Sequence, residues 1–249
     1  MWTLLHGFTG SPRSYDPMLH CADLSDLPCI PALTGHGVDW RSRAIDSFED
    51  EVSRLISFQS DITQPRFVCG YSLGARLALG MLAAKPNLFD GALLIGVHPG
   101  LTEQAARDER REIDSRRASL LREKGLACFV AAWEGLPLFA SQRALPPERL
   151  AVQRENRLAH DPEGLARSLE ILGLAEMPDY AAAFASLEIP IVLMTGSLDS
   201  KFSKVATALA ADNAHIEVQL VDGVGHNVLL EAPAVVAAAL KRVEELARR

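Results

Sequence analysis

One stretch of the chain decides the fold, and it reads Val68-Cys69-Gly70-Tyr71-Ser72-Leu73-Gly74-Ala75. It begins in a short apolar run of the kind found in buried strands, and residues 73–84 continue with the apolar spacing of a helix. The pattern predicts a sharp strand-to-helix turn that holds Ser72 in strained backbone angles, with its hydroxyl exposed above a sheet. Gly70 and Gly74 fit this prediction because the strand and helix backbones approach too closely there for side chains.

Short apolar runs elsewhere alternate with helical patterns, an order typical of a parallel sheet with crossover helices. Most of these runs are continuously apolar, as expected of strands that are buried on both faces. A closing helix is expected over residues 233–246, where apolar residues have helical spacing and Lys and Arg come near the end. The expected strands are residues 2–5, 67–69, 92–95, 191–195 and 216–221.

The middle of the chain interrupts this alternation. From about residue 102 to residue 180 there is little strand pattern and much helical pattern, rich in Arg, Glu and Ala. A helical block inserted between two strands would form a lid over the carboxyl edge of the sheet, where open α/β sheets bind ligands. We therefore expect an α/β core made of residues 1–101 and 181–249, with residues 102–180 forming a helical cap.

Two further residues complete a catalytic arrangement with Ser72. A serine at such a turn needs an acid and a base, in the chain order Ser, then Asp or Glu, then His. Asp199 follows the expected strand 191–195, and His226 follows the strand 216–221 after a glycine-rich approach. Because parallel strands end at one edge of the sheet, Ser72, Asp199 and His226 are predicted to form a catalytic triad.

Backbone amides are expected to complete the site. The amide that follows the serine, that of Leu73, would be one donor of an oxyanion hole. His6-Gly7-Phe8-Thr9-Gly10 follows the first strand, so the Phe8 amide is the natural second donor. We expect His6, and His36 in the turn Gly35-His36-Gly37, to have structural roles in holding these loops.

The composition excludes several classes of function. The 249 residues carry 25 basic and 32 acidic side chains, a formal net charge of −7 that disfavours nucleic-acid partners and anionic membrane surfaces. No apolar run approaches the roughly 20 residues that span a bilayer, and the first five residues lack the pattern of a signal peptide. We therefore expect a cytoplasmic protein. Cys21, Cys29, Cys69 and Cys128 form no C-x-x-C pair, so neither a metal site nor a disulfide framework is expected.

Taken together, these motifs resemble a known family along the whole chain. The set H-G-F-x-G, G-H-G, G-Y-S-L-G-x-R, D-x-K-F and G-x-G-H is similar to that of the α/β-hydrolase superfamily. The resemblance implies an α/β-hydrolase fold, in which helices flank a mostly parallel sheet and a helical cap is inserted between sheet strands.

A narrower resemblance rests on other stretches, namely His98-Pro99-Gly100-Leu101, Trp133 before Leu138-Phe139-Ala140-Ser141, and Asp199-Ser200-Lys201-Phe202. With the G-Y-S-L-G-x-R motif, these look like the 2-succinyl-6-hydroxy-2,4-cyclohexadiene-1-carboxylate synthases of menaquinone biosynthesis. Such enzymes act on 2-succinyl-5-enolpyruvyl-6-hydroxy-3-cyclohexene-1-carboxylate, a small anionic molecule with three carboxylates, from which they remove a ring proton and expel pyruvate. The resemblance implies no metal or organic cofactor.

The resemblance also implies which residues bind that substrate. Arginine suits carboxylates because its planar fork can form two parallel hydrogen bonds. Arg76 lies one helical turn past Ser72, on a helix that is usually buried, so a charged residue there favours a functional role. Arg110 and Arg154 lie in mixed-charge runs, which are most often solvated helix faces. Arg157 lies in the same run as Arg154 and is an alternative to it. The residues implied to bind substrate are Tyr71, Arg76, Arg110, Trp133 and Arg154.

The chain departs from the family pattern at a few positions. Ala75 and Thr34 stand where the family usually has a second glycine and a proline. The loop 173–178 lacks a glutamine before its proline and carries Glu176, whose carboxylate would disfavour an anionic substrate. The amino-terminal hairpin typical of the superfamily is expected to be absent or trimmed.

Three functions remain open at this point. In the leading hypothesis, Ser72 is activated by His226 and removes the ring proton, while Asp199 fixes the histidine tautomer. The alternative is a serine hydrolase that cleaves a small ester, thioester or carbon–carbon bond through an acyl-enzyme. A non-catalytic binding protein on the same fold is disfavoured because all three triad positions are intact.

Overall fold

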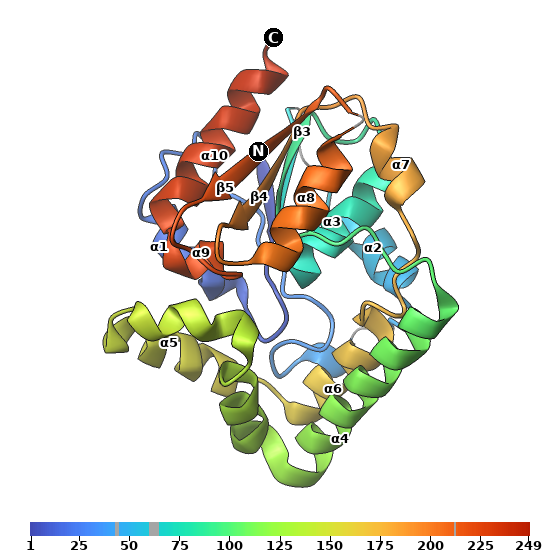
Figure 1. The fold of residues 1–249 in the computed structure, drawn as a ribbon, viewed down its shortest axis with the longest axis vertical. Coiled ribbons are helices and arrows are strands. Elements are labelled where there is room, and N and C mark those ends of the chain that lie inside the picture. Colours follow the sequence, from blue (N-terminus) through green and yellow to red (C-terminus); the bar gives the residue numbers. More distant parts are fainter. Residues whose placement is uncertain (43–44, 60–64, 212) are drawn as a thin grey trace.

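A computed structural model describes residues 1–42, 45–59, 65–211 and 213–249 (Figure 1). Its centre is a parallel five-stranded sheet in which the strands follow one another in sequence order. All five strands were predicted, and three of them extend one or two residues beyond the expected bounds. The strands are β1 (Trp2–Leu5), β2 (Phe67–Tyr71), β3 (Gly91–Ile95), β4 (Ile191–Gly196) and β5 (Ile216–Val221).

Burial of the strands follows their composition. β1 to β4 are buried along their whole length, as continuous apolar runs require when helices cover both faces of the sheet. Among the described residues, β5 pairs only with β4, and its alternating sequence includes Glu217 and Gln219. It is therefore a partly exposed edge strand, whose polar residues reach water.

Helices cover the two faces of the sheet in separate layers (Figure 1). Each layer packs its own apolar cluster against the strands, so the sheet is the middle of three layers. The helix α3 begins directly after β2, as predicted. One layer holds α2 (Phe48–Ser57), α3 (Leu73–Ala84), α7 (Ala181–Ala185) and α8 (Ser200–Ala210), and the other holds α1 (Asp16–Leu19), α9 (Val228–Glu231) and α10 (Pro233–Ala247). Short 3-10 turns lie at Pro12–Tyr15 (η1) and Trp40–Ser42 (η2).

The chain between β3 and β4 forms the predicted helical insertion. In Figure 1 these helices lie together beyond one end of the sheet. They share a small apolar cluster of their own, in which Phe129 and Leu121 from the first helix pack with Leu165 from the last. The division of the chain into two domains at residues 102 and 180 stays a prediction. The insertion consists of α4 (Gln104–Glu134, interrupted at Gly125), η3 (Pro137–Ala144), α5 (Pro147–Leu158) and α6 (Pro162–Leu172).

The turn between β2 and α3 has the strained geometry that the opening motif predicts. Ser72 has φ +53° and ψ −106°, a region that residues with a side chain rarely adopt. The turn is possible because α3 starts against β1: a Cβ atom on Gly74 would lie 2.0 Å from the carbonyl oxygen of Leu5. Glycine at position 74 therefore sets how closely the helix approaches the sheet.

We expect Gly74→Ala to lower the free energy of unfolding by at least about 2 kcal/mol, because the added methyl group meets backbone that cannot move aside. Gly80→Ala on the same helix is the matched control. Its added methyl group would meet the flexible side chain of Val52 at 2.7 Å, and alanine also favours the helix, so its change should stay within about 1 kcal/mol. Urea unfolding curves of the two variants measure the difference. Equal stability of Gly74→Ala and the wild type would contradict this account of the turn.

Candidate active site

Ser72, His226 and Asp199 come together from three loops at one edge of the sheet. The Ser72 Oγ lies 3.1 Å from His226 Nε2, and His226 Nδ1 lies 2.7 Å from Asp199 Oδ2. The histidine and the aspartate are both buried. With Nδ1–H donating to Asp199, the neutral ring presents Nε2 as the acceptor for the serine proton, the geometry that a general base needs.

The loops that carry the acid and the base are joined to each other. A Cβ atom on Gly196 would lie 2.1 Å from the carbonyl oxygen of Val224, so only glycine lets the loop after β4 pass the loop after β5. The Leu198 amide donates to the same carbonyl oxygen at 2.9 Å. The Gly225 amide donates to Glu231 at 2.9 Å. These contacts hold the two loops that carry Asp199 and His226, and none of them involves a side chain of the triad.

The expected oxyanion donors are free to bind a ligand. In the part of the chain that the structure describes, neither the Phe8 amide nor the Leu73 amide donates a hydrogen bond to the protein. Thr9, the next residue, has φ +62° and is held by two histidines. Its amide donates to His36 Nε2 at 3.2 Å, and its carbonyl oxygen lies 3.2 Å from His160 Nε2. His160 belongs to the helical insertion, which therefore helps to position the oxyanion loop.

The turn at residues 34–37 also explains one departure from the family pattern. The amide and hydroxyl of Thr34 donate to the buried carboxylate of Glu51 at 2.9 and 2.8 Å. Arg54 pairs with the same carboxylate at 2.7 Å. A proline at position 34 has neither donor, so threonine and Glu51 form an alternative support for the turn that carries His36.

A cavity of about 190 Å³ lies directly above Ser72, between the sheet edge and the helical insertion. Its charged lining is entirely cationic among the described residues: Arg76, Arg110, Arg117 and Lys201 line it, and no carboxylate does. The carboxylate of Asp114 lies behind the arginines, 2.6 Å from Arg110 and 3.1 Å from Arg117. The side chains that line the cavity therefore carry a net positive charge.

Burial and a neighbouring positive charge both weaken the affinity of the Arg76 guanidinium for its proton. Burial, and then the charge of Arg110, lower the pKa of Arg76 to about 9. Arg76 donates to the carbonyl oxygen of Leu172 at 2.9 Å, which is a neutral partner. The carboxylate of Asp114 offsets part of this repulsion, and an anionic ligand would offset more of it.

Two aromatic residues of the predicted substrate-binding set also line the cavity. Tyr71 lies beside His226, with ring centres 5.5 Å apart. Trp133 lines the cavity and also packs within the insertion, stacked on Phe129 at 5.7 Å and beneath the guanidinium of Arg117 at 5.1 Å. The indole Nε1 of Trp133 is buried with no partner in the described residues.

The placement of Arg154 differs from the expectation. Its guanidinium is bonded to Glu134, and it lines neither this cavity nor the neighbouring one. Arg157, one turn further along α5, is the buried residue of the pair and lines the neighbouring cavity. The orientation of α5 buries Arg157. The sequence does not show which arginine is buried, because both lie in the same mixed-charge run.

Arg117, Lys201 and His98 also line the cavity, and none of them was predicted from the sequence to have a role there. A signal for Arg117 was present: Arg110, Asp114 and Arg117 have the i, i+4, i+7 spacing of one helix face. Lys201 and His98 lie in the D-S-K-F and H-P-G-L stretches that carried the resemblance. Only the folded loops show that these two stretches, which are far apart in the sequence, line the same cavity.

Glu176 does not oppose an anionic ligand. Its carboxylate pairs with Arg111 at 2.8 Å on the outside of the insertion, and it is absent from the residues that line the cavity. The neighbouring Gly173 and Leu174 line the cavity instead. The altered loop therefore contributes Gly173 and Leu174 to the cavity, while the carboxylate of Glu176 pairs with Arg111 of α4.

The described residues contain no group of three or more His, Cys, Asp or Glu side chains that could hold a metal ion. That the reaction needs no cofactor stays a prediction. Within the same residues, no helix is both long and apolar enough to cross a membrane.

The comparisons with known proteins agree with this geometry. The model described as the alpha/beta hydrolase family matches residues 4–239. The chain belongs to the alpha/beta hydrolase family. This membership confirms the fold and the family that the motifs predicted.

Within the alpha/beta hydrolase family, the chain is similar over nearly its whole length to several proteins that share one name. A 2-succinyl-6-hydroxy-2,4-cyclohexadiene-1-carboxylate synthase of Enterobacter sp. is 32% identical over 245 residues, which cover 97% of this chain and 90% of that protein. The protein of the same name from Citrobacter koseri is 34% identical, with 97% and 92% covered. The solved structure of MenH from S. aureus has a TM-score of 0.91 and 27% identity, and it covers 100% of this chain and 94% of that one.

The surroundings of His98 should make the free energy of unfolding depend on pH. Burial, and then the charges of Lys201, Arg76 and Arg110, lower the pKa of His98 to about 4. The unfolded histidine binds a proton near its ordinary pKa of 6.5, so the unfolded state takes up a proton first as the pH falls. His98 therefore reduces the free energy of unfolding as the pH falls through the window from about 6.5 to about 4.

We expect His98→Asn to lose less stability than the wild type between about pH 7 and pH 5. The asparagine Oδ1 can accept the hydrogen bond that the Gly100 amide donates to His98 Nδ1 at 3.2 Å, so the turn is kept. Urea unfolding at the two pH values measures the difference. If both proteins lose the same free energy, His98 does not stay neutral in the folded protein.

Proposed function

We propose that this protein eliminates pyruvate from 2-succinyl-5-enolpyruvyl-6-hydroxy-3-cyclohexene-1-carboxylate, to give 2-succinyl-6-hydroxy-2,4-cyclohexadiene-1-carboxylate. The observation that carries the proposal is the cavity above Ser72, which Arg76, Arg110, Arg117 and Lys201 line and which no carboxylate of the described residues enters. A substrate with three carboxylates fits such a lining. The names and the overall similarity of the synthases support the same choice.

Proton removal is the step that the triad would perform. His226 takes the proton of the Ser72 hydroxyl as Ser72 Oγ removes a proton from the substrate ring, and Asp199 stabilises the imidazolium that forms. The electron pair of the broken C–H bond enters the ring as part of a conjugated diene. The ring C–O bond to the enolpyruvyl group breaks, and that group leaves with its bonding pair and is protonated to pyruvate.

Two parts of the site would lower the energy of this step. The free amides of Phe8 and Leu73 would bind the oxygen of the succinyl carbonyl, on which negative charge develops as the proton leaves. The arginines would hold the carboxylates and so align the ring proton with Ser72. Since Arg76 and Arg110 are partly removed from water, their charges act more strongly than they would at the surface.

The alternative is a serine hydrolase with the same triad. Ser72 would then attack a carbonyl carbon, and an acyl-enzyme would form before hydrolysis. This chemistry is favoured by the proximity of Ser72, His226 and the free amides, but it does not require four cations around the cavity. The two functions differ in their products, so one set of assays separates them.

We expect the purified protein to release pyruvate from the synthase substrate and to hydrolyse p-nitrophenyl acetate slowly and without a burst. Ser72→Ala should lower kcat for pyruvate release by about a thousandfold or more, because it removes the group that takes the proton. A coupled lactate dehydrogenase assay measures pyruvate. Rapid ester turnover with a burst, together with no pyruvate release, would favour the hydrolase instead.

Arg117 should act on substrate affinity. We expect Arg117→Ala to raise KM for the synthase substrate about tenfold or more, since a charged hydrogen bond to a carboxylate is lost, and to leave the turnover of a neutral ester nearly unchanged. Arg116→Ala is the matched control, because Arg116 lies on the exposed side of the same helix and does not line the cavity. Equal losses of Arg117→Ala on both substrates would instead indicate damage to the insertion.

A further inference from the structure

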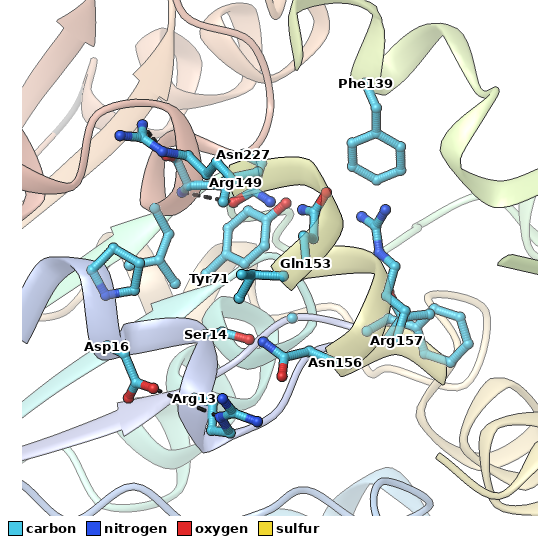
Figure 2. Close-up of a pocket in the computed structure, with 18 of the residues that line it drawn as sticks. Arg13, Ser14, Asp16, Tyr71, Phe139, Arg149, Gln153, Asn156, Arg157 and Asn227 are labelled. Atoms are coloured by element: carbon cyan, nitrogen blue, oxygen red, sulfur yellow. Dashed lines mark hydrogen bonds and ion pairs between the residues drawn. The ribbon is translucent and has the colours of Figure 1, made fainter. Parts of the chain in front are cut away.

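The loop that carries the Phe8 amide borders two cavities. Residues 7–10 all line a second cavity of about 370 Å³, which Figure 2 shows in close-up (Figure 2). Phe8 also lines the cavity above Ser72. The Phe8 ring packs against Trp133, with ring centres 5.2 Å apart, but the main chain of the loop has open space beside it. Its shape therefore depends on hydrogen bonds as well as on packing.

The backbone of this loop is strained. The Gly10 amide donates to the Gly7 carbonyl oxygen at 3.0 Å, which closes a turn with Phe8 and Thr9 at its centre. Thr9 has φ +62°, a value that a β-branched residue rarely adopts. Such a conformation persists only where surrounding contacts impose it. The direction of the Phe8 amide therefore depends on the contacts that hold Thr9, the next residue in the turn.

The two histidines that hold Thr9 come from different parts of the fold. His36 belongs to the turn 35–37 of the core, and its Nε2 accepts the Thr9 amide at 3.2 Å. His160 belongs to the insertion, where it lies just before α6, and its Nε2 lies 3.2 Å from the Thr9 carbonyl oxygen. The two imidazole rings meet edge to face, with centres 5.4 Å apart.

Backbone partners determine the tautomer of His160. The Gly37 amide donates to His160 Nδ1 at 2.9 Å, so the proton of the neutral ring is on Nε2, which donates to Thr9. The side chain is buried, and burial lowers the pKa of His160, in agreement with a neutral ring. His160 therefore makes two separable contacts: Nδ1 binds the turn 35–37, and Nε2 binds the oxyanion loop.

The start of α6 determines where His160 lies. Asp161, the next residue, caps α6 by accepting the Gly164 amide at 3.1 Å. A Cβ atom on Gly35 would lie 2.3 Å from the Gly164 carbonyl oxygen, so the first turn of α6 lies directly against the core. His160 is thus held in place by helix and turn backbone before any ligand binds.

We propose that His160 is a positioning residue for the oxyanion hole, because its Nε2–H holds the Thr9 carbonyl oxygen and so directs the Phe8 amide toward the oxygen that becomes negative. The insertion then affects the rate of the chemical step, and not only the binding of substrate through its arginines. The inference rests on the oxyanion hole of the proposed function, which the hydrolase alternative would use as well.

Two substitutions separate the two contacts of His160. In His160→Gln the side-chain nitrogen can replace Nε2 and donate to Thr9. In His160→Asn, the matched control, the side-chain oxygen can replace Nδ1 and accept the Gly37 amide, but the bond to Thr9 is lost. We expect His160→Asn to lower kcat for pyruvate release about tenfold or more, and His160→Gln to stay within about threefold of the wild type.

The Michaelis constant distinguishes this role from a merely structural one. An oxyanion hole acts on the transition state, so KM should change by less than about twofold in both variants. A substitution that only loosened the insertion would raise KM instead, because Arg110 and Arg117 of the insertion line the cavity above Ser72. Urea unfolding curves check that both variants fold.

Two NMR measurements do not depend on the reaction. In the wild type at neutral pH, the ring nitrogen signals of His160 should show a neutral imidazole with its proton on Nε2. The backbone amide signals of Phe8 and Thr9 should move in His160→Asn and stay close to the wild type in His160→Gln. If His160→Asn does not fold, the tautomer in the wild type and the kcat of His160→Gln still test the proposal.

Equal kcat values of His160→Asn and His160→Gln, or a wild-type His160 with its proton on Nδ1, would overturn the proposal. Absence of pyruvate release would contradict the proposed function instead. The two variants are then compared in the hydrolysis of p-nitrophenyl acetate, which uses the same oxyanion hole, and a slower His160→Asn would leave the role of His160 standing.

Discussion

The close approach of β2 and α3 at Ser72 is the constraint on which the rest of the site depends. Gly74 lies against the Leu5 carbonyl, so the helix starts where the strand ends and the serine is held at φ +53°. Ser72, Leu73 and Phe8 all line the cavity at this edge of the sheet. The acid and the base then need only to reach this point from the ends of β4 and β5.

The charge of the protein is distributed unevenly. The chain as a whole carries a formal net charge of −7, yet the cavity above Ser72 is lined by four cations. A net charge describes the outer surface, which governs contacts with polyanions and membranes, whereas the binding of a small molecule depends on the groups within a few ångströms. An acidic protein can therefore have an active site that is built for anions.

The helical insertion covers the edge of the sheet and also supplies residues to both cavities. It supplies Arg110, Arg117 and Trp133 to one cavity and Arg157 to the other. His160 connects it to Thr9, beside the Phe8 amide. Because the insertion contacts both the oxyanion loop and the ligand space, its position on the sheet affects binding and the geometry of the reaction together.

Features that depend on short-range spacing or chain order could be predicted from the amino-acid sequence. The sharp turn at Ser72, the five strands and the order of Ser72, Asp199 and His226 all follow from local patterns, since each residue needs only its place at a strand end. Which arginines line a cavity depends on the tertiary structure. Arg154 and Arg157 are three residues apart in one mixed-charge run, and only the packing of α5 against the core buries the second and leaves the first half-buried. Charged helix faces carry no local signal for burial, because their partners come from distant parts of the chain.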